Sequence, residues 1–303
     1  SIPVTPSKPA AKVDGDQMVV TWVGHATVLI QTQGLNILTD PIYADRAGPF
    51  GIGPTRVADS GVRFADLPKI DLIVVSHNHY DHMDLTTLKR LWDRDKPLIV
   101  TSLGNDTLIN NAGARGVALD WGQRKTLRPG VDVIVTRTQH WGSRWGSGTG
   151  RGLWSSFVVT LPGGNIFFAG DTGYGDGKWP AEAAQFGPVR FAMIPIGAFR
   201  FMDGQMDTGS HIGPFKAERV FSGLGASYAL PIHWGTIQLS NEAIDTPPKM
   251  LAEVLKCGGY KDISAFEGKT IGVPFAVPPY AKPETRPAPT DACLAGDAIT
   301  RLK

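Results

Sequence analysis

The chain has 303 residues, of which 42% are hydrophobic and 19% are charged, and its net charge is +2. This is the composition of an ordinary globular protein with a sizeable core, and we favour one domain over two small ones. So small a charge creates no field that would favour nucleic acid, and a preference for acidic substrates or membranes would have to come from local patches.

No apolar run approaches the roughly 18 residues of a membrane span, and the first residues resemble no part of a leader peptide. We therefore expect a soluble protein whose leader, if any, is absent from this chain, and the compartment stays open. The two cysteines, Cys257 and Cys293, are far from the histidines and have no metal-like spacing. The sequence indicates neither a disulfide framework nor a thiolate zinc site.

Composition divides the chain into three parts. Residues 1–16 are rich in Pro, Lys and Ala without periodicity, which predicts an extended N-terminal arm. Residues 17–274 carry the patterns of strands and helices and are expected to form the main folded domain. Residues 275–303 form a Pro-rich C-terminal tail.

Apolar patterns in the middle part predict strands that alternate with helices, as in α/β proteins. Residues 42–69 contain several Gly and Pro residues and predict a long surface loop. We expect helices at 84–94, where Asp84 is the cap, and at 105–111, 214–224 and 249–256. We expect strands at 18–31 (two, meeting at a glycine corner), 35–39, 71–75, 98–101, 117–119, 132–138, 154–161, 165–169, 191–196, 228–232 and about 270–274.

The densest group of polar side chains is residues 76–82, Ser-His-Asn-His-Tyr-Asp-His, directly after the buried strand at 71–75. Alternate side chains of an extended segment share a face, so His77, His79 and Asp81 can converge, and a turn at Asp81 brings His82 to a second position. Imidazole and carboxylate groups bind divalent metals, and the spacing predicts two neighbouring ions. The alternative is a polar loop with surface histidines, but chance rarely produces this pattern.

Three more strands end in a potential ligand: His140, Asp171 and His233. Each has an ordinary interpretation, a hydrogen-bonded structural histidine or a Gly-Asp turn. Five of the seven histidines nevertheless fall at ends of predicted strands, where open α/β proteins place their sites. We therefore predict that these side chains complete the metal site.

Three other residues have two interpretations each. Asp40 ends a strand and can accept the free N–H of a ligand histidine, or it can cap the turn that Pro41 begins. His25 lies at the glycine corner and is either a support or substrate contact, or a structural histidine. His211 precedes a predicted helix and is a candidate to face the substrate.

The spacing of these residues resembles the signature of the metallo-β-lactamase superfamily, His-x-His-x-Asp-His followed by a distant His, an Asp and a His. All seven positions match. Within that superfamily, the chain from about Val19 to Pro248 resembles the branch of phospholipases D that hydrolyse N-acylphosphatidylethanolamine. The resemblance is carried by residues 24–27, 38–41, 76–82, 170–174, 194–198 and 232–236.

The resemblance implies an α/β fold, an αββα sandwich of two mixed β-sheets face to face with flanking helices. It also implies two Zn²⁺ ions at one edge, with Mn²⁺ or Fe²⁺ as alternatives. One metal would be held by His77, His79 and His140, the other by Asp81, His82 and His233, with Asp171 between them. The branch also suggests substrate contacts at Arg200, Phe201 and His211.

The resulting hypothesis is a zinc-dependent phosphodiesterase of phospholipase D type, acting on N-acylphosphatidylethanolamine-like phospholipids. A hydroxide between the metals would attack, and Asp81 would orient it and take its proton. A lactone or ester hydrolase is the first alternative, and a non-catalytic metal-binding protein is the second.

The expected partner is a small molecule or a phospholipid. Nucleic acid is not expected, because superfamily members that process it usually carry an inserted domain, and the sequence shows no insertion bounded by linkers. Aromatic residues near the predicted site could contact a membrane as a peripheral anchor, or they could be core or rim packing. They are Trp141, Trp145, Phe199 and Phe201.

Overall fold

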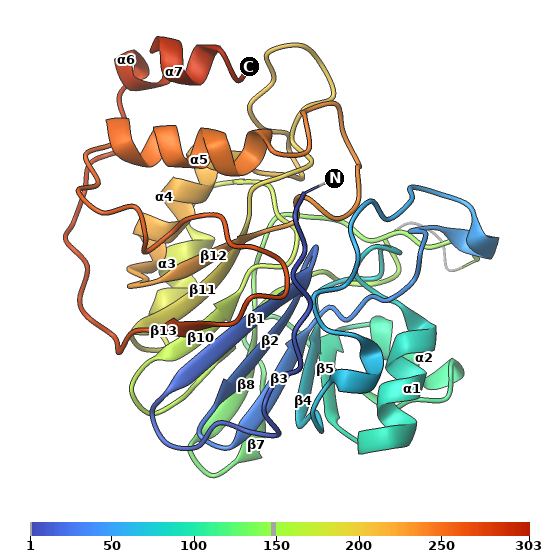
Figure 1. Cartoon of the computed structure of the whole chain (residues 1–303). Helices are drawn as coiled ribbons and strands as arrows, with labels where there is room; N and C mark the ends of the chain where they lie inside the picture. The colour runs from blue at the N-terminus through green and yellow to red at the C-terminus, as the bar shows by residue number, and fades with distance from the viewer. Residues whose placement is uncertain (1, 147–149) are drawn as a thin grey trace.

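The computed structural model describes residues 2–146 and 150–303. Two β-sheets pack face to face, and helices cover their outer faces (Figure 1). The predicted αββα sandwich is therefore confirmed.

The first sheet has seven strands in the order β13-β1-β2-β3-β4-β5-β6. Strands β1 to β3 are antiparallel, whereas β3 to β6 run parallel. The helices α1 (Leu85–Asp95) and α2 (Asn105–Asn111) cover its outer face, where Leu88, Leu91 and Ile109 are fully buried. The strands are β1 (Met18–Gly24), β2 (Thr27–Thr32), β3 (Leu35–Thr39), β4 (Leu72–Val75), β5 (Leu98–Ser102), β6 (Gly116–Leu119) and β13 (Phe275–Val277).

The second sheet has six strands in the order β12-β11-β10-β9-β8-β7, and β10 to β12 run parallel. The larger helices α4 and α5 lie on its outer side (Figure 1). The strands are β7 (Arg124–Arg128), β8 (Val131–Thr136), β9 (Ser156–Val159), β10 (Asn165–Phe168), β11 (Val189–Pro195) and β12 (Ala229–Ile232). The helices are α3 (Trp179–Ala184), α4 (Pro214–Leu224), α5 (Thr246–Cys257), α6 (Asp291–Leu294) and α7 (Asp297–Thr300).

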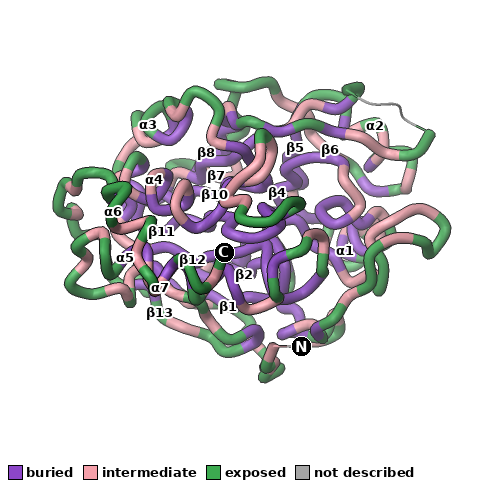
Figure 2. Tube along the Cα trace, turned by 90° about the horizontal axis from the view of Figure 1, so that it is seen from above, coloured by how far each residue is buried: buried purple, intermediate pink, exposed green. Residues whose placement is uncertain are grey.

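The main core lies between the two sheets, where the central strands are buried, whereas β6, β7 and most of β13 are more exposed (Figure 2). Large side chains such as Trp22, Phe157 and Phe191 are completely inaccessible there. Polar groups in such a layer cost free energy unless they find partners, so this apolar interior leaves the strand ends as the place for a polar site. The segments that follow β3, β4, β10 and β12 meet at one such edge.

Most predicted elements are found within two or three residues of the expected bounds, and the helices at 105–111 and 214–224 match at both ends. Asp84 caps α1 and accepts a hydrogen bond from the Thr87 N–H, as predicted. The long stretch 42–69 contains only two short 3-10 turns, Pro49–Gly51 and Phe64–Asp66. The strand expected at about 270–274 is wrong, because the pairing strand is β13, a few residues later.

The two outer segments both pack on the middle one. The arm joins it through a bridge between Val4 and Ile271 and a hydrogen bond from the Ser7 hydroxyl to the Gly272 carbonyl. The tail supplies β13, which pairs with β1. The division at 16/17 and 274/275 stays a prediction from composition.

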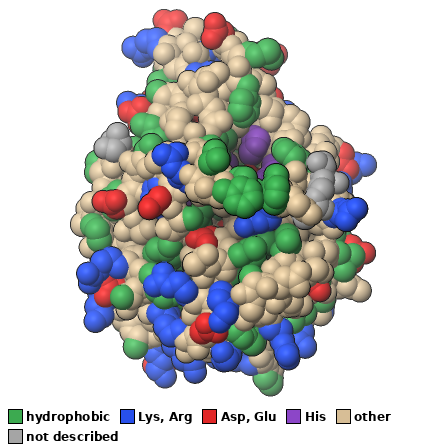
Figure 3. Space-filling view, turned by 90° about the vertical axis from the view of Figure 1, so that its right-hand side faces the viewer, with side chains coloured by type: hydrophobic (Ala, Val, Ile, Leu, Met, Phe, Trp, Pro, Cys, Tyr) green, Lys and Arg blue, Asp and Glu red, His purple; other side chains and the backbone are tan. Residues whose placement is uncertain are grey.

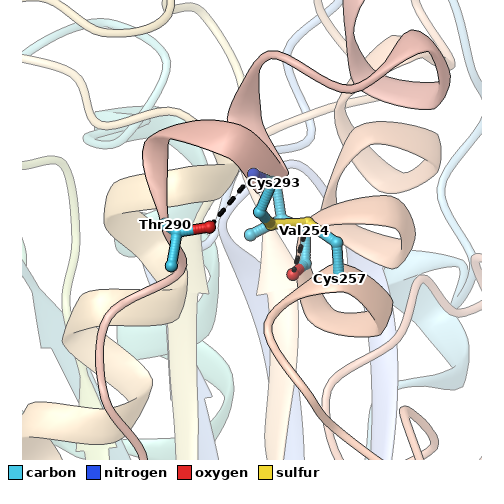
Figure 4. The surroundings of a disulfide bond; sticks show 4 residues. All are labelled: Val254, Cys257, Thr290 and Cys293. Atoms are coloured by element: carbon cyan, nitrogen blue, oxygen red, sulfur yellow. Dashed lines mark hydrogen bonds between the residues drawn. A yellow bond between two sulfur atoms is a disulfide. The ribbon is translucent and has the colours of Figure 1, made fainter.

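Cys257, the last residue of α5, and Cys293 in α6 form a disulfide, with Cα atoms 5.4 Å apart (Figure 4). The statement that the sequence indicates no disulfide is therefore corrected. The two helices meet over a small apolar cluster that includes Phe199, Val254 and Ile299, and spacing in the sequence gives no sign of that packing.

Among the helices of the described residues, none is long and apolar enough to cross a membrane.

The disulfide closes a loop of 36 residues, and its removal leaves the unfolded chain with more freedom. We expect Cys257→Ser to lower the free energy of unfolding by about 2–4 kcal/mol, which urea denaturation measures. Limited proteolysis reports separately whether α6 and α7 detach in this variant. The reductant control is a double variant with serine at both positions, which should not respond to dithiothreitol. A wild type that is equally stable with and without reductant would contradict this expectation.

Candidate metal centre

Seven histidine and aspartate side chains meet at the shared edge of the sheets. They arrive from the ends of four strands: β4 leads to residues 77–82, β8 to His140, β10 to Asp171 and β12 to His233. Their ligand atoms fall into two groups in which all atoms lie within 4.8 Å of one another. The first group is His77, His79, His140 and Asp171; the second is Asp81, His82 and His233, together with His25.

The segment after β4 is fixed by its own turn and by α1. The backbone N–H groups of His82 and Met83 both donate to the His79 carbonyl, at 3.0 and 2.9 Å. The Asp84 carboxylate caps α1 and accepts from the backbone N–H groups of Tyr43 and Ala44. The turn holds its histidines and Asp81 in place from both ends.

Three site residues have positive φ although none is glycine: His25 (54°), Asp40 (29°) and His233 (65°). Such backbone conformations are strained for residues with a Cβ and cluster at functional sites. Each follows a strand, and the turn directs its side chain across the strand end. His25 and His233 also meet directly, since the His233 N–H donates to the His25 carbonyl at 3.1 Å.

The first group brings three imidazole nitrogens together. His79 Nδ1 lies 2.9 Å from His77 Nε2 and 3.3 Å from His140 Nε2. The Asp171 carboxylate completes the group, with Oδ2 at 3.8 Å from His77 Nε2 and 3.7 Å from His140 Nε2.

Hydrogen bonding on the far side of His140 decides what these nitrogens can do. Its Nδ1 lies 2.9 Å from the Ser210 carbonyl, which only accepts, so Nδ1 carries the proton and Nε2 of the neutral ring presents a lone pair. This lone pair faces His79 Nδ1 at 3.3 Å, the same nitrogen that lies 2.9 Å from His77 Nε2. A cation between the nitrogens satisfies them together, and the donor set therefore fits a divalent metal.

The second group is tighter. His82 Nε2 lies 3.1 Å from each of Asp81 Oδ2, Asp171 Oδ2 and His233 Nε2. His233 Nε2 lies 2.9 Å from Asp171 Oδ1. One oxygen of Asp171 faces His233 while the other faces both groups, which is the placement of a carboxylate between two cations.

Two fully buried residues support the second group. Asp40 Oδ2 accepts a hydrogen bond from His82 Nδ1 at 2.6 Å, so His82 directs its Nε2 toward the cluster. His25 Nε2 lies 2.8 Å from Asp81 Oδ2. These contacts agree with the support interpretation of both residues, and their roles toward a metal stay predictions.

Electrostatics divides the histidines into two kinds. Burial lowers the pKa of His77 well below its usual value and that of His140 to about 3, so both are neutral ligands at neutral pH. Burial also acts to lower the pKa of His233, but Asp171 and Asp81 outweigh it and raise the pKa to about 9. Without a metal, the proton on His233 supplies positive charge beside these carboxylates, and a bound metal ion would supply that charge instead.

The carboxylates show the reverse balance. Burial acts to raise the pKa values of Asp81 and Asp171, but the neighbouring His82 and His233 hold both pKa values well below the usual range. Both carboxylates are therefore ionised at neutral pH. Asp40 differs, because burial raises its pKa against the donors His82 and Ser76.

The remaining predicted site residues do not all join the cluster. His211 is half-buried, with Nδ1 3.9 Å from Asp171 Oδ2, and Trp141 packs its ring against His79 at 4.3 Å between centroids. The Arg200 guanidinium instead donates to the carbonyls of Gln205 and Leu302. Phe201 is half exposed and lies in a bend at 201–202, in the loop toward His211.

The suggestion that Phe199 is an exposed aromatic is wrong. Its ring is completely buried and packs with Met250, Val254 and Ile299 beneath the C-terminal helices. The sequence shows an aromatic loop there, and only the packing of α5 and α7 over it shows that this ring belongs to the core.

Histidine side chains are visible at the surface on one face, bordered by hydrophobic side chains (Figure 3). Trp145 lies beside this opening, because its backbone N–H donates to the hydroxyl of Tyr80 between two cluster residues. Phe50 packs edge-on against Trp145, with ring centroids 4.9 Å apart. The segment 142–152 is glycine-rich, a pattern typical of a loop that could border the site, and its residues 147–149 lie outside the described residues. Arg144 anchors the first part of this segment to the carbonyls of Asn78 and Met83.

Sequence reasoning missed three hydroxyl or carbonyl partners of the cluster. Ser76 contacts Asp40 and His77, Ser210 accepts from His140, and Thr236 accepts from the His25 N–H at 2.8 Å. Ser76 could have been noticed because it adjoins the histidine motif. The other two have no signal in the sequence, since only the fold brings them to the site.

Comparison with known proteins agrees with this geometry. Residues 35–234 match the model of the beta-lactamase superfamily domain. The chain is 32% identical to an N-acyl-phosphatidylethanolamine-hydrolyzing phospholipase D of Caenorhabditis elegans, over 77% of this chain and 68% of that protein. A mitochondrial protein of the same description from Saccharomyces cerevisiae is 32% identical over 80% of this chain, but the match spans only 53% of that protein.

Solved structures show the same fold at low identity. A metallo hydrolase from the archaeon Ignicoccus hospitalis is 16% identical, with a TM-score of 0.63 over 86% of this chain and 98% of that one. An isothiocyanate hydrolase from Delia radicum gut bacteria is 20% identical, with a TM-score of 0.64 over 85% of this chain and 98% of that one. From its fold, its cluster and these matches, the chain belongs to the metallo-β-lactamase superfamily of metal-dependent hydrolases.

Proposed function

We propose that the cluster binds two zinc ions and hydrolyses phosphodiesters of N-acylphosphatidylethanolamine-like phospholipids, in the manner of a phospholipase D. The observation that carries the proposal is the convergence of three imidazole nitrogens in the first group, with Asp171 facing both groups. The substrate class is supported by the two relatives described as hydrolysing N-acyl-phosphatidylethanolamine. The products would be a phosphatidic acid and an N-acylethanolamine.

Each metal would have its own ligands. His77, His79 and His140 would hold the first ion, and Asp81, His82 and His233 the second, with Asp171 shared. Bound divalent cations would lower the pKa of water into the neutral range and neutralise charge on the phosphoryl oxygens.

The protein's own residues would position the reactants. Asp81, fixed by His25 and ionised at neutral pH, would orient the attacking water and accept its proton. Burial lowers the pKa of His211, so its imidazole is neutral at neutral pH, and its Nδ1 lacks a hydrogen-bond partner. Because His211 lies beside Asp171 and its side chain is 18% exposed, we assign it a contact with the substrate's phosphoryl group.

Two alternatives use the same site. A lactone or ester hydrolase would direct the same water at a carbonyl carbon. A non-catalytic metal-binding protein would need no solvent-accessible side of its centre, and the half-exposed His79 and His211 argue against it.

Metal content tests the ligand assignment. We expect the metal-free protein to bind two equivalents of Zn²⁺ per chain in competition with a chromogenic chelator. His140→Ala and His233→Ala should each retain one equivalent, since each variant removes a ligand from one group only. Parallel titrations with Mn²⁺ and Fe²⁺ identify the preferred metal. A wild type that binds one equivalent or none would refute the two-metal centre.

Turnover tests the substrate and the role of Asp81. We expect zinc-loaded wild type to release phosphatidic acid from N-acylphosphatidylethanolamine, measured by mass spectrometry, and Asp81→Ala to lower kcat by about 10²–10⁴-fold. The matched control is Asp93→Ala, which removes an exposed carboxylate paired with Lys89 on α1.

A lactone and a soluble phosphodiester are assayed in parallel. Turnover of the lactone alone would favour the first alternative, and no turnover of any substrate by protein with two bound ions would favour the second. Full activity of Asp81→Ala would remove Asp81 from the mechanism.

We also propose that the opening contacts the membrane that contains the substrate. Large apolar side chains are exposed around it: Phe50 is 77% exposed and Trp145 is 71% exposed. Met202, which is 68% exposed, lies in the loop that leads to His211. Trp145, an aromatic side chain with a polar N–H, favours the lipid–water interface, and Phe50 and Met202 add apolar surface, so these residues suit a peripheral contact.

Vesicle binding tests this contact. We expect the variant with Phe50→Ser and Trp145→Ser to bind phosphatidylcholine vesicles containing N-acylphosphatidylethanolamine about 10- to 100-fold more weakly, because two apolar side chains no longer enter the lipid. Phe186→Ser is the control, since Phe186 is 36% exposed but adjoins the start of β10, at the opposite edge of the sheet. Equal binding of all three proteins in a sedimentation assay would argue against the contact.

A further inference from the structure

One buried hydroxyl lies between the two metal groups. Ser76 Oγ is 2.6 Å from Asp40 Oδ2 and 2.8 Å from His77 Nδ1. The same oxygen of Asp40 also accepts from His82 Nδ1 at 2.6 Å. Asp40 therefore contacts a second-group histidine directly and a first-group histidine through Ser76.

The direction of these hydrogen bonds follows from proton counting. A serine hydroxyl has one proton, and the Asp40 carboxylate, which also receives the Ser76 N–H at 2.7 Å, is the acceptor for it. Because the hydroxyl donates its one proton in the hydrogen bond to Asp40, Ser76 Oγ acts as the acceptor toward His77. His77 then carries its proton on Nδ1 and presents the Nε2 lone pair to His79 Nδ1 and to Asp171.

The position of Ser76 leaves its side chain little freedom. Ser76 and Asp40 are both completely buried, and the Gly170 backbone before Asp171 packs against Ser76. A Cβ added at Gly170 would lie 2.5 Å from the Ser76 Cβ, so the turn that carries Asp171 closes over the serine. The Gly170 backbone therefore covers the Ser76 side chain on one side, and the hydroxyl bonds to Asp40 and His77 on the other.

We propose that Ser76 is a positioning residue that fixes the tautomer and orientation of His77, so that Asp40 orients one ligand of each metal. The inference rests on the proposed metal centre and adds a residue to which the ligand motif assigns no role. Removing the hydroxyl should affect the zinc affinities of the two sites unequally, because Asp40 keeps its hydrogen bonds to the Ser76 N–H and to His82. Loss of the Ser76 hydroxyl should weaken the first site and spare the second.

The experiment measures each site separately in the full chain. His233→Ala leaves the first site and His140→Ala leaves the second, and Ser76→Ala is added to each. Zinc affinity is measured by competition with a chromogenic chelator. In His233→Ala, which leaves the first site, we expect Ser76→Ala to weaken zinc binding about 10- to 100-fold, the usual effect of losing a partner that orients a ligand. In His140→Ala, which leaves the second site, we expect Ser76→Ala to weaken zinc binding by less than about threefold. Ser102→Ala is the control, because among the described residues the Ser102 hydroxyl hydrogen-bonds to the backbone carbonyls of Ser76 and Leu153 and to the Asn105 amide, and to no predicted ligand.

A second measurement needs no variant. In metal-free wild type labelled with ¹⁵N-histidine, the His77 ring should show the proton on Nδ1. A proton on Nε2, or equal weakening of both sites by Ser76→Ala, would overturn the proposal even with two bound zinc ions. If the wild type binds no zinc at all, the proposed centre itself fails, and that outcome is distinct from either result for Ser76.

Discussion

The structure depends on holding ionised carboxylates and imidazole rings close together away from water. Asp171 is almost completely buried and faces nitrogens of both groups, and His77, His82 and His140 surround it. Groups of this kind lose hydration when they are buried, and in the second group the attraction between the carboxylates and the imidazoles with raised pKa values offsets part of that cost. The imidazoles of His77 and His140 are neutral, so the protein must hold them in place by its own packing.

The sandwich provides the necessary rigidity. Strands β4, β10 and β12 are buried along their whole length, and each ends within a residue or a few of the cluster. A strand fixed by packing on both faces cannot slide and displace the groups at its end. The same packing maintains the positive φ values of Asp40 and His233, whose strain would otherwise relax.

Much of this site could be predicted from sequence because the information is local. The motif at 76–82 places four donors within six residues after a buried strand, and His140, Asp171 and His233 each follow a strand pattern. What could not be predicted depends on contacts between distant segments. The burial of Phe199 and the Cys257–Cys293 disulfide both require α5 to meet the C-terminal helices. The edge strand β7 was missed because its residues, Arg-Lys-Thr-Leu-Arg, are mostly polar and exposed.

Strand geometry explains why the two metal groups receive support in different ways. Asp40 ends β3, and β4 lies beside it in parallel, so the carboxylate meets the first residue after β4, Ser76. The turn after β4 then brings His82 back to Asp40, whereas His77 points away toward the opposite sheet. The Asp40 carboxylate bonds to His82 directly and is linked to His77 through the short hydroxyl side chain of Ser76. The residue before the first histidine is thus constrained by the architecture of the sheet as well as by the chemistry of the ligands.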